Sequence, residues 1–331
     1  MIQNSPILVS VIVPVYNVSR FIETCARSIF EQTLDNLEIL FINDCTPDNS
    51  IDIIKHLLNE YPNRRNSTRV ISMAKNSGLA SVRRRGILEA KGEYIIHCDG
   101  DDWVDVTLYQ QMYEKAITDS SDIVVCDFIY ETSKGPALYS QPKISGSSKI
   151  ALENWYKQFF HMSCANKLVR RTLLTNNNLL PWPGLNMWED NGLMIRTFYH
   201  ATRVSQIHSS FYHYNRKNET SMSAGYGEKQ VNQMIAIAKK IDHFFEDKPD
   251  RDRFEKTISA LKFYAKINLI TDKFSGLAKF NQVFPGAERI ASKLDKNAFS
   301  FKGRIRWRMV RYQLTPLFIL LFKISKRIKR A

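Results

Sequence analysis

The first 130 residues alternate short apolar runs with segments whose apolar residues recur at helical spacing. The apolar runs, rich in Val, Ile and Leu, lie at 8–13, 38–42, 69–73, 94–98 and 122–126. Helical periodicity occupies the stretches at 19–33, 48–60 and 77–90. Continuous apolar strands separated by helices are typical of a parallel sheet that helices cover on both faces. The sequence therefore predicts an α/β fold with a mostly parallel sheet flanked by helices.

Polar residues follow three of these predicted strands. Tyr16 and Asn17 come after the first strand, Asn43 and Asp44 after the second, and an acidic turn, residues 99–102, after the fourth. In open α/β sheets, ligands bind beyond the carboxyl ends of the strands. We therefore expect these three clusters to form one site at one edge of the sheet.

The acidic turn reads Asp99-Gly100-Asp101-Asp102. Carboxylates this close repel one another unless a cation lies among them. Oxygen-rich sites suit Mg²⁺ or Mn²⁺ that bridges a diphosphate, and such an ion neutralises charge on a departing nucleotide diphosphate. A solvated loop or a helix N-terminus is the alternative interpretation, and the turn alone does not decide between them.

Five motifs around this turn carry a resemblance to a known family. They read VSVIVPVYN at 9–17, SIFEQT at 28–33, EILFINDCTPDNS at 38–50, KNSGLASVR at 75–83 and DGDDW at 99–103. In order and spacing they resemble the motifs of family 2 glycosyltransferases with the GT-A fold. The resemblance covers residues 8–130 and continues more loosely to about 225. It implies a UDP-sugar as donor and Mn²⁺ or Mg²⁺ as cofactor.

The resemblance also implies roles for matching residues. Asp44 would accept a hydrogen bond from the uracil imide, Asp99 would reach the ribose side, and Asp101 would bind the metal, with His213 as a second candidate ligand. The implied nucleotide-sugar contacts are Pro14, Tyr16, Asn17, Asp44, Asn76, Arg83, Asp99, Gly100 and Asp102. Packed or solvent-exposed structural roles are the alternatives for Tyr16 and Arg83. This chain departs from the family pattern at Asn43, where the family has Asp, and at Arg84, where it has Asn.

The acceptor side is predicted further along the chain. The sequence Trp188-Glu189-Asp190 resembles the family's "ED" motif, which implies that Asp190 is the base that takes a proton from the acceptor hydroxyl. An acidic pair at a helix N-terminus is the alternative. The segments at 166–171 and 211–223 resemble those of polysaccharide-type members, which implies that Arg216 or His213 pairs with the diphosphate. Trp188, Glu189 and Arg216 are thus assigned to the acceptor or phosphate side.

Charge is concentrated at the carboxyl end of the chain. The net charge is +14, and residues 302–331 contain ten basic residues and no acidic one. The apolar run at 317–322 is too short to cross a bilayer, and its combination with cations is typical of an interfacial amphipathic segment. We expect residues 301–331 to bind an anionic membrane surface. A nucleic-acid-binding arm is the competing interpretation, although no nucleic acid is expected.

These patterns predict a GT-A domain at 1–225, with nucleotide-sugar binding at 1–130 and the acceptor side at 131–225. A helical appendage follows at 226–300, and the basic tail at 301–331. Five cysteines without a CxxC pair, and no secretory pattern, favour a cytoplasmic protein on the inner face of the cell membrane. The expected reaction is inverting transfer of a hexose or aminosugar from a UDP-sugar to a hydroxyl of a lipid-linked saccharide. The alternatives are a nucleotide-sugar-binding protein without turnover and a basic nucleic-acid-binding protein.

Overall fold

The computed structural model describes residues 6–144, 146–218, 227–271, 274–275, 277–294 and 308. The chain divides into two compact units. Residues 1–151 and 161–221 form the first unit, and residues 152–160 and 222–331 form the second. The predicted membrane tail lies outside the described residues, apart from Arg308.

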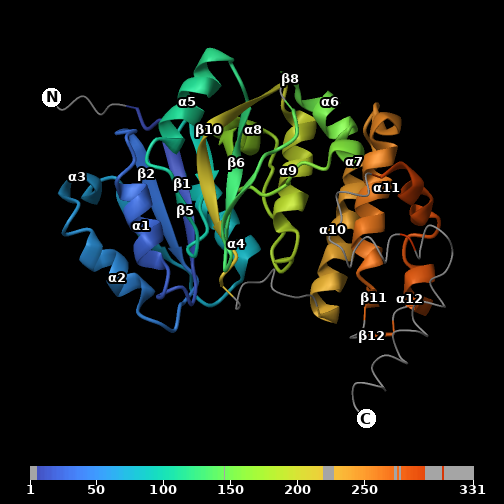
Figure 1. The fold of residues 1–331 in the computed structure, drawn as a ribbon, viewed down its shortest axis with the longest axis horizontal. Coiled ribbons are helices and arrows are strands. Elements are labelled where there is room, and N and C mark those ends of the chain that lie inside the picture. The colour runs from blue at the N-terminus through green and yellow to red at the C-terminus, as the bar shows by residue number, and fades with distance from the viewer. Residues whose placement is uncertain are drawn as a thin grey trace, which may run out of the picture. The chain divides into compact units, whose positions relative to one another are not determined.

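The first half of the main sheet is parallel, in the order β3-β2-β1-β4. Figure 1 shows β2 and β1 of this half beside each other. These strands are β1 (Val9–Val15), β2 (Leu37–Asn43), β3 (Thr68–Ser72) and β4 (Tyr94–His97). All but β3 are almost wholly buried, as continuous apolar strands in a doubly covered sheet must be. The predicted strands in this half are confirmed to within about two residues, the usual uncertainty of element ends.

Helices cover both faces of these strands. The helices of this half are α1 (Ile22–Phe30), α2 (Ser50–Leu57), α3 (Pro62–Arg65) and α4 (Leu79–Glu89). Val11 of β1 shares a core with α1, whereas its neighbour Ile12 points to the other face and contacts Gly86 of α4. Successive strand residues face opposite sides, so the alternation along β1 places α1 and α4 on opposite faces of the sheet.

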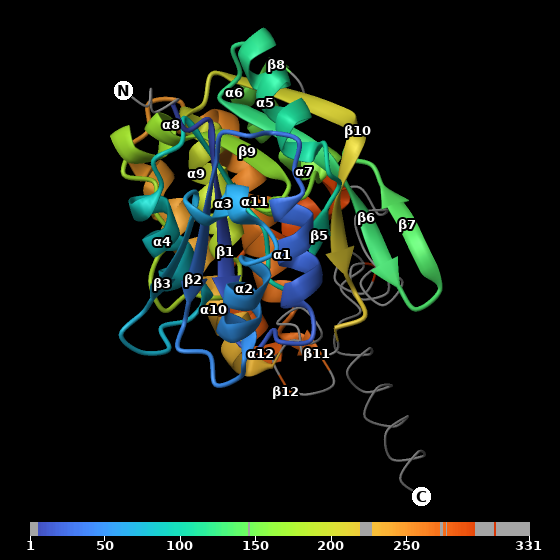
Figure 2. The same cartoon turned by 90° about the vertical axis from the view of Figure 1, so that its left-hand side faces the viewer.

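The second half of the sheet is mixed rather than parallel. Short strand β9 (Lys167–Arg170) runs antiparallel to both β4 and β6 (Ile123–Thr132), and β10 (Arg203–Asn215) runs parallel to β6 (Figure 2). The remaining elements of this unit are β5 (Trp103–Val104), α5 (Leu108–Thr118), β7 (Gly135–Tyr139), β8 (Gly146–Ser147), α8 (Arg171–Asn176) and α9 (Glu189–His200). Helix α6 (Ser148–Glu153) begins in this unit and ends in the second. The predicted parallel arrangement thus holds for β1 to β4, whereas β9 interrupts it by running antiparallel to both of its neighbours.

The second unit is mainly helical. Among its described elements, the two longest helices are α10 (Glu228–Glu246) and α11 (Arg251–Ile267), which residues 247–250 separate. Its other elements are α7 (Trp155–Gln158), β11 (Ile270–Thr271), β12 (Phe274–Ser275), α12 (Leu277–Gln282) and the 3₁₀ helix η2 (Ala287–Lys293). Within the described part of the chain, no helix has both the length and the apolar character needed to cross a bilayer.

Candidate functional site

The acidic turn follows β4 and lies against the end of β1. The N–H of Asp102 donates to the carbonyl of Asp99 over 3.0 Å, which closes the turn. A Cβ at Gly100 would come within 2.9 Å of the carbonyl oxygen of Pro14. The structure therefore brings Pro14 and Gly100 together, and the turn can approach β1 this closely only without a side chain at position 100.

The acidic turn holds more negative charge than its neighbours balance. Burial, followed by the nearby charge of Asp99, raises the pKa of Asp101. Burial, followed by Asp101 and then Asp99, raises the pKa of Asp102 well above its usual range. Because hard divalent cations prefer oxygen ligands, this set of carboxylates fits Mg²⁺ or Mn²⁺. Among the described residues, no three His, Cys, Asp or Glu side chains converge to form a complete metal site by themselves.

Arg83 joins the acidic turn to the predicted acceptor side. Its side chain is 3% exposed on α4, and its Nη2 donates to Asp99 Oδ1 over 2.7 Å. Its Nε lies 3.3 Å from Glu189 Oε1, and its Nη1 donates to the thiol of Cys164. One buried guanidinium thus contacts three segments that are far apart in the sequence.

The start of α9 carries Glu189 and Asp190. Trp188 precedes them in the left-handed region, with a φ of 66°, so the helix begins abruptly at the acidic pair. Burial and then the charge of Asp190 raise the pKa of Glu189 to about 8. Burial also raises the pKa of Asp190, against the opposing effect of Arg83, and the N–H of Asn191 donates to Asp190 Oδ1 over 2.7 Å. A carboxylate with a raised pKa is a stronger base, which suits the role predicted for Asp190.

Lys167 is a buried cation near this pair. Its ammonium group donates to the carbonyl oxygens of His161 and Ser163 and to Asn166 Oδ1, over 2.5, 2.8 and 2.8 Å. Burial lowers its pKa to about 7, while the charge of Asp190 opposes that shift. No role is predicted for Lys167 from the sequence, although a lysine directly before the apolar pair Leu168-Val169 was a signal.

The loop after β2 fixes the start of α4. Both oxygens of Asp44 accept backbone N–H groups, from Ser77 over 2.7 Å and from Gly78 over 2.8 Å. The hydroxyl of Ser77 does not cap this helix, because it donates to the carbonyl of Lys75. Asn186, which the sequence analysis also missed, accepts the N–H of Ala80 over 3.1 Å.

The remaining residues predicted to bind the nucleotide lie on the loops after β1 and β3. Tyr16 is 48% exposed, and Asn76 is also exposed. The backbone N–H of Asn17 donates to Thr46 Oγ1 over 2.8 Å, which joins the loop after β1 to the loop after β2. Asn43 accepts the N–H of Thr46 over 2.9 Å, so the residue that departs from the family pattern supports this loop.

His213 and Arg216 lie on and just after β10. The two ring nitrogens of His213 lie 3.0 Å from Glu131 and 3.0 Å from Asp105, and its ring stacks on Trp103. A metal bond from His213 would therefore require it to leave one of these carboxylates, and that assignment stays a prediction. Arg216 is exposed, and its guanidinium lies 5.0 Å from the centre of the Tyr130 ring.

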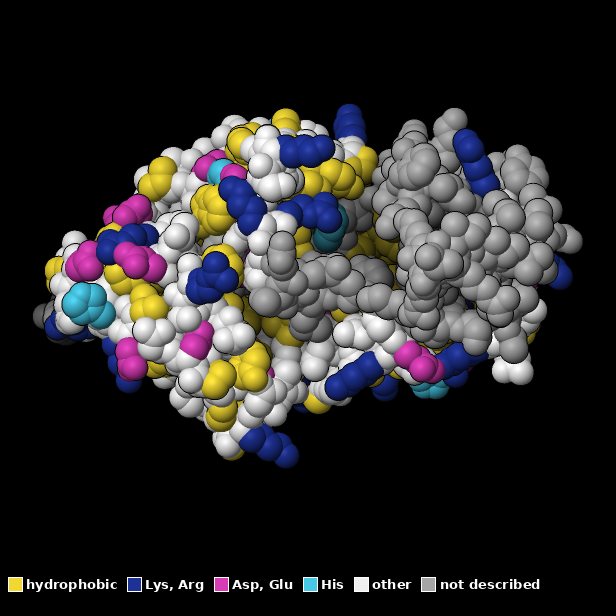
Figure 3. All heavy atoms as spheres, turned by 60° about the horizontal axis from the view of Figure 1, so that its bottom comes forward, with side chains coloured by type: hydrophobic (Ala, Val, Ile, Leu, Met, Phe, Trp, Pro, Cys, Tyr) yellow, Lys and Arg dark blue, Asp and Glu magenta, His cyan; other side chains and the backbone are white. Residues whose placement is uncertain are grey.

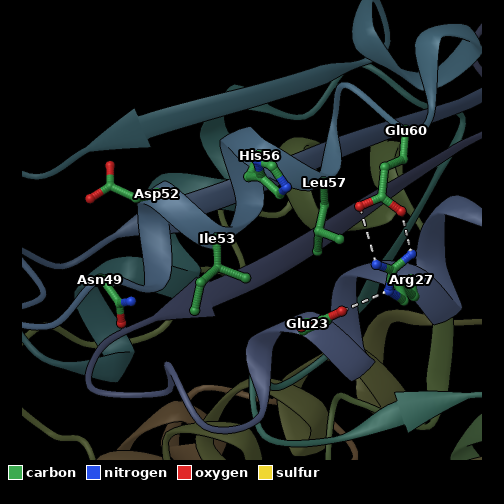
Figure 4. A pocket seen from close by; sticks show the side chains of 8 residues that line it. All are labelled: Glu23, Arg27, Asn49, Asp52, Ile53, His56, Leu57 and Glu60. Atoms are coloured by element: carbon green, nitrogen blue, oxygen red, sulfur yellow. Dashed lines mark hydrogen bonds and ion pairs between the residues drawn. The ribbon is translucent and has the colours of Figure 1, made fainter.

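A separate hollow lies between α1 and α2 (Figure 4). It is lined by Glu23, Arg27, Asn49, Asp52, Ile53, His56, Leu57 and Glu60, and none of the predicted site residues is among them. Arg27 is already paired there with Glu23 and Glu60, over 3.0 and 2.8 Å. On the left-hand part of Figure 3, which belongs to the first unit, basic and acidic side chains are interspersed.

Comparisons with known proteins agree with this geometry. The profile of the family described as "Glycosyl transferase family 2" matches residues 10–176. The uncharacterized glycosyltransferase EpsJ of Bacillus subtilis (strain 168) is 36% identical over 223 residues, which are 65% of this chain and 63% of EpsJ.

Solved structures share the fold. Residues 1–349 of S. aureus TarS, in complex with UDP-GlcNAc, superpose with a TM-score of 0.71 at 19% identity, covering 97% of this chain and 92% of that one. The mannosyltransferase PcManGT from Pyrobaculum calidifontis, in complex with GDP-Man and Mn²⁺, has a TM-score of 0.56 at 14% identity and covers 98% of this chain and 88% of that one. These similarities confirm the predicted GT-A-type α/β fold. The chain belongs to the family 2 glycosyltransferases.

Proposed function

We propose that this glycosyltransferase moves a hexose or aminosugar from a UDP-sugar to a carbohydrate hydroxyl with inversion at the sugar's C1. The observation that carries the proposal is the position of Arg83. It pairs with Asp99 of the acidic turn and lies 3.3 Å from Glu189, the neighbour of the proposed base. Donor-side and acceptor-side carboxylates therefore meet around one buried cation.

The nucleotide would occupy the loops after β1 and β2. Tyr16 offers an exposed ring on which a base can stack. The oxygens of Asp44 each accept one backbone N–H, and a carboxylate oxygen has room for a second donor. The uracil imide could thus share Asp44 with the start of α4. TarS, whose solved complex contains UDP-GlcNAc, gives the choice of UDP independent support.

A divalent cation would be held by Asp101, with Asp99 on the nucleotide side of the turn. Mg²⁺ and Mn²⁺ commonly take one or two protein carboxylates and complete their coordination with substrate phosphates. When bound, the cation would supply positive charge to the diphosphate leaving group. PcManGT, which was solved with Mn²⁺, supports this expectation.

Asp190 would act as the base. As the acceptor oxygen bonds to C1 and the bond from C1 to the UDP oxygen breaks, the hydroxyl proton passes to an Asp190 oxygen. A single displacement of this kind inverts C1. Burial and then the charge of Asp190 raise the pKa of Glu189, and that charge opposes the lowering of the Lys167 pKa by burial. Glu189 and Lys167 would therefore influence in turn how readily Asp190 takes a proton.

The reaction is tested by measuring UDP release from a panel of UDP-sugars with Mn²⁺, with Mg²⁺ and with EDTA. We expect metal-dependent release with at least one donor, and an increase when a carbohydrate acceptor is present. Tight UDP binding without release from any donor would instead favour the alternative of a nucleotide-sugar-binding protein.

We further propose that the acceptor is a lipid-linked saccharide in cell-surface polysaccharide or lipopolysaccharide synthesis, met at the cytoplasmic face of the membrane. The ten cations of residues 302–331 support this, because each basic residue near an anionic surface contributes about 1 kcal/mol to binding. Flotation with anionic and with neutral liposomes tests it. The full chain should float with anionic liposomes and a variant ending at residue 300 should not; equal flotation of the two would contradict the proposal.

A further inference from the structure

The last carboxylate of the acidic turn faces β10. Asp102 is 1% exposed. Its Oδ2 accepts the hydroxyl of Tyr212 over 2.6 Å, and its Oδ1 accepts the backbone N–H of Asn215 over 2.7 Å. Both oxygens are therefore engaged by uncharged donors from one strand, and the carboxylate is buried with them.

Tyr212 holds the first residue of the turn as well as the last. Its hydroxyl accepts the backbone N–H of Asp99 over 3.0 Å while donating to Asp102. The side chain is fully buried, and its ring packs edge-on against Phe128 at a centroid distance of 5.6 Å. One rigidly packed hydroxyl thus fixes both ends of a four-residue turn.

The other side of the turn is fixed by β1. Gly100 lies so close to the carbonyl of Pro14 that a Cβ would come within 2.9 Å of it. Asp101, between these two anchors, accepts the side-chain amide of Asn218 over 2.7 Å. The turn is consequently held between β1 and β10, with Asp99 and Asp101 as the carboxylates that are not buried against Tyr212.

We propose that Tyr212 and Asp102 are positioning residues that clamp the acidic turn onto β10, so that Asp99 and Asp101 are held ready for the donor. On this view Asp102 touches neither the nucleotide-sugar nor the metal, which refines the role that the family resemblance implies for it. The inference rests on the proposed function, because it takes Asp101 as the residue that binds the cation. Residues beyond the metal ligands that orient them commonly change metal affinity by about 10- to 100-fold when they are replaced.

A purely structural role for the Tyr212 hydroxyl is separated by a matched control. Tyr94 is also fully buried, and its hydroxyl donates to the carbonyl of Ser121 over 2.9 Å. Tyr94 begins β4, whereas the acidic turn follows the other end of that strand. Tyr94→Phe therefore removes one buried hydroxyl from the same sheet without touching the turn.

The experiment measures UDP affinity of the full chain by calorimetry with Mn²⁺ and with EDTA, together with thermal midpoints. We expect Tyr212→Phe to weaken Mn²⁺-dependent UDP binding by roughly 10-fold or more, while Tyr94→Phe binds like the wild type. Both variants should lose thermal stability by similar amounts. Wild-type affinity in Tyr212→Phe, or an equal loss of affinity in Tyr94→Phe, would overturn the inference.

A second variant tests Asp102 itself. Asp102→Asn keeps an oxygen for the N–H of Asn215 but disturbs the bond to Tyr212, so its loss of affinity should match that of Tyr212→Phe. Because both residues act through one hydrogen bond, their effects should not add. The double variant should bind UDP with the affinity of whichever single variant has the larger loss. If the fold-losses in UDP affinity of the two single variants multiplied in the double variant, Asp102 would act independently of Tyr212, as a ligand would. That result would overturn the inference. Absence of Mn²⁺-dependent UDP binding in the wild type would overturn the proposed function, and this inference with it.

Discussion

The acidic turn and the start of α9 both bury carboxylates, but different kinds of group hold them. In the turn, Asp102 is held by the hydroxyl of Tyr212 and the N–H of Asn215, which are neutral. At the start of α9, Glu189 and Asp190 lie near the fixed positive charge of Arg83. Neutral donors do not offset the negative charge of Asp102, whereas Arg83 offsets part of the charge of Asp99 in the turn and of the acidic pair at α9.

This difference suits two kinds of chemistry. A site for a divalent cation needs negative charge that the protein does not itself offset, and in the turn Arg83 pairs with Asp99, over 2.7 Å, and not with the proposed ligand Asp101. A base must remain ionised in a buried place, which a nearby cation favours. Arg83 contacts both regions, because it pairs with Asp99 in the acidic turn and lies near Glu189 at the start of α9. Substitutions around Arg83 can therefore separate the proposed cation site from the proposed base.

The largest effect is expected from removing the proposed base. Asp190→Asn should lower kcat by roughly 10²- to 10⁴-fold, the range in which general bases contribute. UDP affinity with Mn²⁺ should stay unchanged, because Asp190 lies at α9 and not in the acidic turn. Transfer kinetics and calorimetry measure the two quantities. Wild-type turnover in this variant would show that Asp190 is not the base.

Arg83→Met should reduce the free energy of unfolding by about 3–5 kcal/mol, because it leaves buried carboxylates without their cation. The matched control is Arg85→Met on the same helix. Arg85 is 44% exposed and pairs with Glu89 over 2.9 Å, so its loss should cost at most about 1 kcal/mol. Urea denaturation compares them. Similar costs for the two variants would contradict the view that Arg83 connects the two regions energetically.

Gly100→Ala tests how tightly the acidic turn is held against β1. The added Cβ meets the backbone oxygen of Pro14, which cannot turn aside as a flexible side chain would. We expect a loss of about 1–3 kcal/mol in unfolding free energy, together with weaker Mn²⁺-dependent UDP binding. Unchanged UDP binding in Gly100→Ala would show that the turn tolerates displacement.

The pH dependence of stability centres on Glu189. Its pKa is raised from 4.5 to about 8 in the folded protein, first by burial. The folded state therefore binds more protons than the unfolded state between these values, and the unfolding free energy falls as pH rises through that range. Glu189→Gln removes this titration, so its unfolding free energy should fall less between about pH 5 and pH 8. Parallel pH dependence in the two proteins, measured by urea denaturation, would contradict a raised pKa for Glu189.

Local patterns in the sequence predicted the first half of the fold well. The apolar continuity of β1, β2 and β4 and the helical spacing of α1 and α4 depend on neighbours in the chain. The reversal at β9 depends instead on pairing with distant strands. Its short run of Lys167 to Arg170 has no periodicity long enough to show direction.

The candidate site was predicted only as a set of motifs. Its defining contacts join residues far apart in sequence, such as Tyr212 and Asp102 at a separation of 110 residues, and Arg83 and Cys164 at 81. No local pattern connects such pairs. The family resemblance implied Arg83, Glu189 and Asp190 separately, but it did not connect them, and it gave no role to Tyr212 or Lys167.

The loop that carries Asp44 also has a practical use. Cys45 is exposed and adopts a left-handed φ of 54°, whereas Cys25, Cys98, Cys126 and Cys164 are buried. A thiol-reactive dye added to the native chain should therefore attach at Cys45, next to the proposed nucleobase position, without any cysteine being engineered. The fluorescence of that single dye would report donor binding directly, and it could rank candidate nucleotide-sugars before any acceptor is known.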